Sequence, residues 1–213
     1  MTTSSNKSSL FPSPETKYMQ RAIQLAYNGV GFVSPNPMVG AVIVADDGRI
    51  IGEGWHRKYG GPHAEVNAVA SVAPSDIKLL KGATIYVTLE PCSHYGKTPP
   101  CSLLLIEKEI GRVVIGSADP FPLVSGRGVK MLRNAGIEVI EDFMRKECDE
   151  INRKFLTAHT LQRPYILLKW AQSSDGFIAA FSESGNPEPV VLSSGYTKML
   201  MHSLRAQYDA ILI

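Results

Sequence analysis

Apolar and polar positions alternate along the chain in patterns that predict both helices and strands. Ser13 suits a helix N-cap and Pro14 suits the first helical position. From residue 18 to residue 26 the apolar side chains recur at three- and four-residue intervals, which is the period of a core-facing helix. Asn28-Gly29 is a typical stop signal. The sequence therefore predicts a first helix that begins near Pro14 and ends near Asn28.

Strands and further helices follow in alternation. Val39–Ala45 is a continuous apolar run of the buried-strand type, and after an Asp-Asp-Gly turn the segment Arg49–Trp55 returns as a second strand. The other expected elements are a helix from His63 to about Val72, a strand Ala83–Leu89, a helix containing Leu103–Ile106, a strand Arg112–Gly116, a helix Gly126–Ala135, a strand Glu138–Ile140 and a long helix through Phe155. This order predicts an α/β domain in which helices cover a largely parallel sheet with an antiparallel hairpin at its edge.

The pattern restarts at residues 161–164, where a second α/β domain is expected to begin. Its expected elements are strands at Tyr165–Trp170, Val190–Leu192 and Ala210–Ile213, with a helix capped by Ser193 or Ser194 before the last strand. The resulting division is a disordered tail at 1–13, a first domain at 14–160 and an incomplete second domain at 161–213.

Composition narrows the class of protein without naming a function. The formal net charge of +2 gives no overall basic field for nucleic acid, and no apolar run is long enough to cross a bilayer. The first ten residues are polar and lack the apolar core of a signal peptide. Three cysteines in such a chain indicate reduced thiols, so we expect a cytoplasmic protein that binds neither nucleic acid nor membrane.

Two segments carry residues that can hold a metal ion. His63 and Glu65 lie at the start of a predicted helix, whereas Cys92 follows a predicted strand and Cys101 precedes a predicted helix. One imidazole and two thiolates suit tetrahedral zinc with a fourth position free for water. Zinc lowers the pKa of bound water, and a neighbouring carboxylate such as Glu65 can transfer its protons. The pattern therefore predicts a zinc-dependent hydrolytic site.

Zinc nucleobase deaminases share the pattern H-x-E followed by P-C-x-x-C. Here eight residues, instead of two, separate the second and third expected ligands, Cys92 and Cys101. Two alternatives stay open on the residues alone. One is a deaminase of another base, such as guanine or a tRNA adenosine. The other is a non-catalytic module with a closed zinc site, for which His56 or His94 could supply a fourth ligand.

The longer spacing belongs to a block that resembles a known family. PNPMVGAVIV at 35–44, GPHAEV at 61–66 and VTLEPCSHYGKTPPC at 87–101 are similar to the deaminase domain of the bifunctional riboflavin biosynthesis proteins. RPYILLKWAQSSDGFIA at 163–179 and LRAQYDAILI at 204–213 resemble the opening of the reductase domain of the same family.

The resemblance implies a cytidine-deaminase-like three-layer α/β/α domain with a mixed sheet, followed by the start of a dihydrofolate-reductase-like domain. It implies that diaminohydroxyphosphoribosylaminopyrimidine, a small phosphorylated pyrimidine, loses its ring amino group as ammonia. One zinc ion would be held by His63, Cys92 and Cys101, and Glu65 would be the proton shuttle. The implied substrate contacts are Asn36, His56, His94, Lys97 and, in the reductase segment, Arg205.

The same resemblance implies NADPH as the reductase cofactor, with Lys169, Ser173 and Asp175 at matching positions. The match stops at Ile213, before the rest of the nucleotide-binding fold, so we expect NADPH binding only where the reductase domain is complete. Two positions depart from the family pattern. Phe121 stands where many relatives have Asn, and Ser174 stands where an apolar residue is usual.

Each implied substrate contact also has a structural interpretation. Asn36 between two prolines can organise a turn, His56 can be a core histidine at a strand end, His94 can cap its loop, and Lys97 can be a solvated charge. Cys148 matches no motif, which indicates a structural or incidental free thiol. Whether the chain forms a homo-oligomer is left open by the sequence.

Overall fold

The computed structural model describes residues 14–95, 99–120 and 126–212. The chain separates into two compact units, Met1–Pro164 and Tyr165–Ile213. The expected disordered tail at 1–13, the expected phosphate contact Lys97 and the departure at Phe121 lie outside the described residues.

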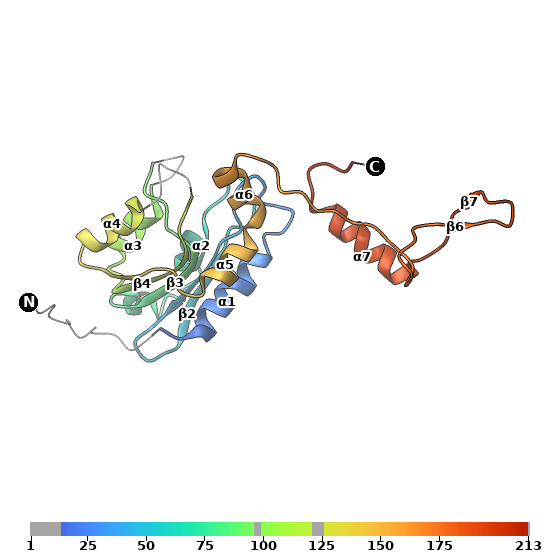
Figure 1. The fold of residues 1–213 in the computed structure, drawn as a ribbon. Helices are drawn as coiled ribbons and strands as arrows, with labels where there is room; N and C mark the ends of the chain where they lie inside the picture. The colour runs from blue at the N-terminus through green and yellow to red at the C-terminus, as the bar shows by residue number, and fades with distance from the viewer. Residues whose placement is uncertain (1–13, 96–98, 121–125, 213) are drawn as a thin grey trace, which may run out of the picture. The chain divides into compact units, whose positions relative to one another are not determined.

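A five-stranded mixed sheet forms the centre of the first unit (Figure 1). Its strands are β1 (Gly40–Val44), β2 (Ile50–Trp55), β3 (Thr84–Leu89), β4 (Arg112–Ser117) and β5 (Glu138–Ile140). Their order is β2-β1-β3-β4-β5; β1 is antiparallel to both β2 and β3, whereas β3, β4 and β5 are parallel. The α/β class and the mixed sheet predicted from the sequence are confirmed.

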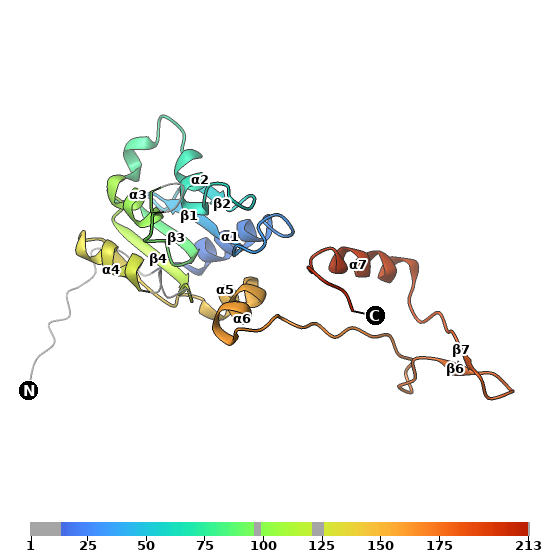
Figure 2. The ribbon, with the colours of Figure 1, turned by 90° about the horizontal axis from the view of Figure 1, so that it is seen from above.

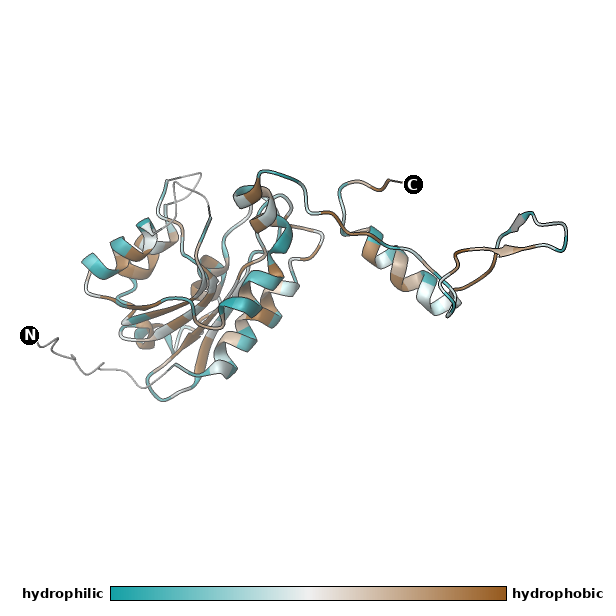
Figure 3. Cartoon of the chain, in the orientation of Figure 1, coloured by the Kyte–Doolittle hydropathy of each residue, from teal (hydrophilic) through white to brown (hydrophobic). Residues whose placement is uncertain are grey.

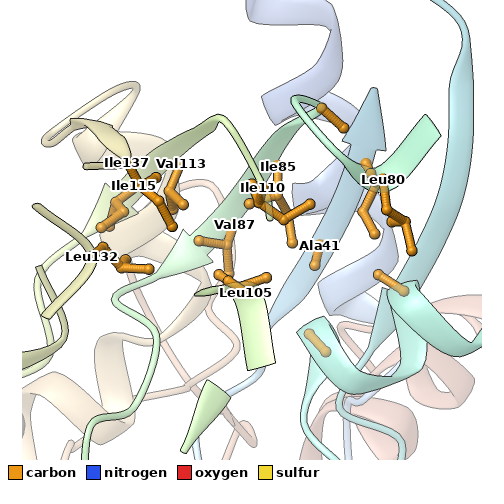
Figure 4. Packing of buried hydrophobic residues seen from close by; sticks show 14 of the residues in the cluster. Ala41, Leu80, Ile85, Val87, Leu105, Ile110, Val113, Ile115, Leu132 and Ile137 are labelled. Carbon is orange, nitrogen blue, oxygen red and sulfur yellow. The ribbon is translucent and has the colours of Figure 1, made fainter. Parts of the chain in front are cut away.

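Helices cover both faces of this sheet, because the buried strands are apolar on both sides. In β1, Ala41 and Ile43 pack into the cluster on one face, whereas Val42 and Val44 pack into the cluster on the other. The first cluster includes residues of α2 (Ala64–Ala70), α3 (Cys101–Glu107) and α4 (Arg127–Asn134), and Figure 4 shows part of it. The second includes residues of α1 (Thr16–Tyr27) and α5 (Arg145–Ile151). Seen from above, the sheet lies between these helices in a three-layer α/β/α arrangement (Figure 2).

Two glycines of β2 let α2 approach the sheet closely. A Cβ atom on Gly54 would lie 2.2 Å from the Ala68 backbone nitrogen and 2.4 Å from the Ala64 carbonyl oxygen. On Gly52 it would lie 2.5 Å from the Ala68 carbonyl oxygen. The helix that begins after His63 is therefore seated directly on the backbone of β2.

Replacing Gly54 by alanine is expected to lower the free energy of unfolding by about 2 kcal/mol, because the methyl group would force α2 away from the sheet. Urea denaturation followed by circular dichroism measures this loss. Gly195→Ala is the matched control, since a Cβ there meets nothing within 4 Å. Equal stability of the two variants would contradict the close packing.

Some element boundaries differ from those predicted. The first helix begins at Thr16 with Glu15 as its N-cap, so Pro14 precedes the helix and does not occupy its first turn. The long helix expected through Phe155 is two helices, α5 and α6 (Arg153–Leu161), which are separated at Asn152 (φ −112°, ψ 23°). A short 3₁₀ helix at Ile77–Leu80 was not predicted.

The second unit differs more from its predicted pattern. Its elements are β6 (Ala180–Phe181), β7 (Pro187–Glu188) and α7 (Gly195–Arg205). Ser194 caps α7 and accepts a hydrogen bond from the Thr197 amide at 3.2 Å, as expected. The structure has no strand at 165–170, 190–192 or 210–212, all of which it describes, so the strands predicted there are wrong.

The missing strands have a physical cause. Hydrophobic residues recur along the ribbon of the second unit (Figure 3). None of the residues of this unit with a described side chain is buried. Leu168 and Val191, for example, are 76% and 82% exposed. Strands need partners and a core face, and the described residues of this unit supply neither to these segments.

No helix within the described ranges is both long enough and apolar enough to span a bilayer.

Candidate active site

His63 lies at the N-cap of α2, with extended backbone angles (φ −71°, ψ 168°), and its side chain is exposed. Ala64 begins the helix, and Glu65 occupies its first turn and is buried. Because His63 lies outside the helical turn, the usual rule that residues two apart face different sides does not separate it from Glu65. The charge of His63 acts on Glu65 and lowers its pKa against the effect of burial.

Cys92 and Cys101 place their sulfur atoms next to the His63 ring. Cys92 follows β3 after Glu90-Pro91, and Cys101 is the first residue of α3. The Cys101 amide donates a hydrogen bond to the Cys92 sulfur at 3.2 Å. The amide and hydroxyl of Ser102 both donate to the Cys92 carbonyl, at 3.1 and 2.8 Å. The start of α3 thus fixes the position of both thiols.

The three side chains have the spacing that zinc requires. Zn–S bonds of about 2.3 Å and Zn–N bonds of about 2.0 Å at tetrahedral angles place sulfur and nitrogen ligands about 3.5 Å apart. His63 Nδ1 lies 3.6 Å from Cys92 Sγ and 3.4 Å from Cys101 Sγ. All three atoms lie within 4.8 Å of one another. The donor set and its spacing therefore fit a tetrahedral zinc ion.

Among the described residues, three side chains form the group that could hold a metal ion. His56, one candidate for a fourth ligand, uses both ring nitrogens elsewhere, on Pro62 and Asn36. His94, the other candidate, is exposed and is not part of the group. Three protein ligands are the number found in catalytic zinc sites, where the fourth position takes water or substrate.

The three ligand side chains shift one another's protonation. The side chains of Cys101 and His63 lower the pKa of Cys92 to about 4. Hydrogen bonding with Cys92 raises the pKa of His63 to about 9. Contact with Cys92, together with burial, raises the pKa of the Cys101 thiol. At neutral pH Cys92 is therefore a thiolate beside a protonated His63, whereas Cys101 stays a neutral thiol. Binding of a metal dication to all three would displace the protons of His63 and Cys101.

Glu65 has the environment of a proton carrier. Burial raises its pKa to about 7, against the opposing effect of His63. A carboxyl group that titrates near neutral pH can both accept and return a proton.

The loop that carries Cys92 is anchored by the buried Glu90. Its carboxylate accepts hydrogen bonds from the amides of Gly126 and Gly128 at 3.0 and 3.1 Å, at the start of α4. A Cβ atom on Gly128 would lie 2.1 Å from the Pro91 carbonyl oxygen, so the two backbones are in contact. Glu90 directly precedes Pro91-Cys92 in the sequence, but no local pattern predicts its hydrogen bonds to the distant amides of α4.

His56 and Asn36 lie beside the metal-ligand group. His56 is 3% exposed, and its ring stands edge-on to that of His63 at 5.6 Å between centroids. Its Nδ1 lies 3.0 Å from the Pro62 carbonyl oxygen, so Nδ1 carries the proton and donates. Burial lowers the pKa of His56, which leaves Nε2 as the acceptor for the Asn36 side-chain amide at 3.4 Å. The structure thus brings both residues to the site.

The remaining predicted residues lie elsewhere or are not described. Arg205 ends α7 in the second unit and is exposed, as is Lys169. The Ser173 hydroxyl donates to the Asp175 carboxylate, and both residues line a cavity of about 350 Å³ in that unit. Cys148 is buried on α5, and burial raises its pKa to about 12, in agreement with an unreactive core thiol.

Comparison with known proteins agrees with this geometry. Residues 12–117 match the family model described as the cytidine and deoxycytidylate deaminase zinc-binding region. The chain is 48% identical over 196 residues to the riboflavin biosynthesis protein RibD of Actinobacillus pleuropneumoniae, and 45% identical over 195 residues to that of Escherichia coli. Each alignment covers 92% of this chain but only 50% or 51% of the relative. The chain therefore spans about half the length of the curated relatives that it matches.

Solved structures of similar proteins also match this chain. A Thermotoga maritima diaminohydroxyphosphoribosylaminopyrimidine deaminase/5-amino-6-(5-phosphoribosylamino)uracil reductase has a TM-score of 0.79 and 46% identity. That match covers 89% of this chain and 52% of the Thermotoga chain. The Aspergillus oryzae Rib2 deaminase, at 23% identity and a TM-score of 0.55, shares the fold.

Proposed function

Because this chain is a homologue of the riboflavin biosynthesis proteins named RibD, we propose that it hydrolytically deaminates diaminohydroxyphosphoribosylaminopyrimidine. Water replaces the ring amino group, which leaves as ammonia, and the product is the pyrimidinedione. The observation that carries the proposal is the meeting of His63, Cys92 and Cys101 at the start of the helix whose first turn carries the buried Glu65.

The three ligands would hold one zinc ion, which supplies a nucleophilic water at neutral pH. Glu65 takes a proton from the attacking water and gives it to the ring nitrogen next to the reacting carbon. Glu65 then takes the remaining proton of the added hydroxyl and delivers it to the departing amine, so that the ring carbonyl forms and ammonia leaves as a neutral molecule. A pKa near 7 allows the same carboxyl group to perform both transfers.

Asn36 and His56 are proposed to face the pyrimidine ring, since both lie beside His63. An amide can both donate to and accept from the polar edge of such a ring. His94 and Lys97 are proposed to contact the substrate from the loop between the two cysteines. A lysine on a glycine-containing loop suits a phosphate group.

Substrate preference distinguishes this proposal from the two alternatives. Ammonia release should be compared for the phosphorylated diaminopyrimidine, dCMP, guanine and a tRNA adenosine, with the zinc-loaded chain. We expect kcat/KM to be highest on the diaminopyrimidine. Higher activity on another base would identify a different deaminase, and no ammonia from any substrate would favour a non-catalytic zinc module.

Reduction of the ribosyl group with NADPH is a separate prediction that concerns the second unit. Lys169, Ser173 and Asp175 remain predicted cofactor contacts, and Arg205 remains a predicted substrate contact. The cavity lined by Ser173 and Asp175 is compatible with this prediction, whereas Lys169 is not among the residues that line it.

A further inference from the structure

Asn152 makes a paired contact with a distant loop of the first unit. Its side-chain oxygen accepts a hydrogen bond from the Met38 amide at 2.8 Å, and its side-chain nitrogen donates one to the Met38 carbonyl oxygen at 2.8 Å. The two residues are 114 positions apart, and Asn152 is 4% exposed. One buried amide thus satisfies both backbone groups of Met38, as a neighbouring strand would do.

The geometry of Asn152 is adapted to this contact. It lies between α5 and α6 with backbone angles that are not helical, and it interrupts what the sequence predicted to be one helix. The backbone amide of Asn152 donates a hydrogen bond to the Asp149 carbonyl at 3.0 Å, and its backbone carbonyl accepts one from the Leu156 amide at 2.8 Å. Both helices therefore hold the backbone of Asn152 while its side chain is directed at Met38.

Met38 belongs to the loop that leads to the candidate active site. Two residues before Met38, the Asn36 side-chain amide contacts His56 Nε2. Directly after Met38, the Val39 carbonyl accepts a hydrogen bond from the His56 amide at 2.9 Å. The amide of Gly40 donates to the Thr88 hydroxyl at 3.1 Å. Residues 38–40 are thus each held by a hydrogen bond, and Asn152 supplies the one nearest to Asn36 on its C-terminal side. On the other side, the Asn36 amide donates to the Val33 carbonyl at 2.8 Å.

From this arrangement we propose that Asn152 is a positioning residue that holds Asn36 and His56 in the geometry needed to bind substrate. It acts through the backbone of Met38 and touches neither the metal ligands nor the reacting atoms. The consequence for substrate binding rests on the deaminase activity proposed above. The effect on the loop itself is independent of that activity.

The test compares the full chain with Asn152→Ala and Asn152→Asp. Alanine removes both contacts, whereas aspartate keeps an acceptor for the Met38 amide and loses the donor to the Met38 carbonyl. Cys148→Ala is the control, because Cys148 lies on the adjoining helix and its buried sulfur faces Gly116. Hydrogen exchange at the Met38 amide, zinc content, kcat and KM are measured for each.

For Asn152→Ala we expect exchange at Met38 to be about tenfold faster and KM for the phosphorylated pyrimidine to rise about tenfold. We expect kcat to change less than about twofold and zinc content to be retained, since the metal ligands are untouched. Asn152→Asp should give intermediate exchange, and the control should match the wild type.

Unchanged exchange at Met38 and unchanged KM would overturn the proposal. Faster exchange throughout the unit, with loss of zinc, would also overturn it, because Asn152 would then be a general stability residue. If the wild-type chain releases no ammonia from this pyrimidine, the proposed function fails, but exchange at Met38 still decides whether Asn152 holds the loop.

Discussion

Replacing Glu65 by glutamine is expected to lower the rate of ammonia release by about 10³-fold. Glutamine keeps the size and polarity of the side chain but cannot take a proton from water or return one to the ring nitrogen and the amine. Because Glu65 is not among the three clustered ligand residues, the zinc content should stay at one per chain. The rate and the zinc content are measured on the same preparation.

Glu53→Gln is the matched control, since Glu53 is a carboxylate on β2 that pairs with Arg21 at the protein surface. Its loss should leave ammonia release nearly unchanged, because exposed ion pairs contribute little to stability. A Glu65→Gln variant with the wild-type rate would exclude Glu65 as the proton shuttle. Loss of zinc from that variant would instead indicate that Glu65 is a ligand.

Replacing Cys101 by alanine is expected to weaken zinc binding by at least about 10³-fold and to reduce ammonia release to background. Cys101 is buried at the start of α3, so no water can replace its thiolate as an equivalent ligand. Zinc at about 1,000 times its dissociation constant should stabilise the wild type by about 4 kcal/mol, and the variant should lose that increment. Thermal unfolding with and without zinc measures this stabilisation in both proteins.

Cys148→Ala provides the control for removal of a thiol. Cys148 is buried on α5 and is not part of the cluster, so this variant should bind zinc as the wild type does, whatever its own stability. Wild-type zinc affinity in Cys101→Ala, or loss of zinc from Cys148→Ala, would contradict the assignment of the ligands.

The sequence predicted the first unit well because its signals are local. The apolar run of β1 and its turn into β2 are set by neighbouring residues, as is the position of His63 at a helix start. The metal-ligand residues were predicted from their types, and the structure places them together. What periodicity could not supply was the direction of β1 relative to β3, which depends on the connection between them.

The features that the sequence did not predict depend on contacts between residues far apart in the chain. The predicted helix is interrupted at Asn152, whose side chain pairs with Met38. A helical apolar pattern contains no sign of such a contact. The anchoring of Glu90 by the amides of α4 is equally non-local. In the second unit, residues 165–170 have a strand-like composition, but they lack a partner strand and a core within the described residues, so composition alone did not produce strands.

The most direct test of the central claim is a titration of the zinc-free chain with zinc while ammonia release from the phosphorylated diaminopyrimidine is recorded. Activity should be absent without metal, rise with added zinc and level off at one zinc per chain, and Glu65→Gln should stay near background throughout. Full activity without zinc, or no ammonia at any zinc concentration, would contradict a zinc-dependent deaminase built on His63, Cys92 and Cys101.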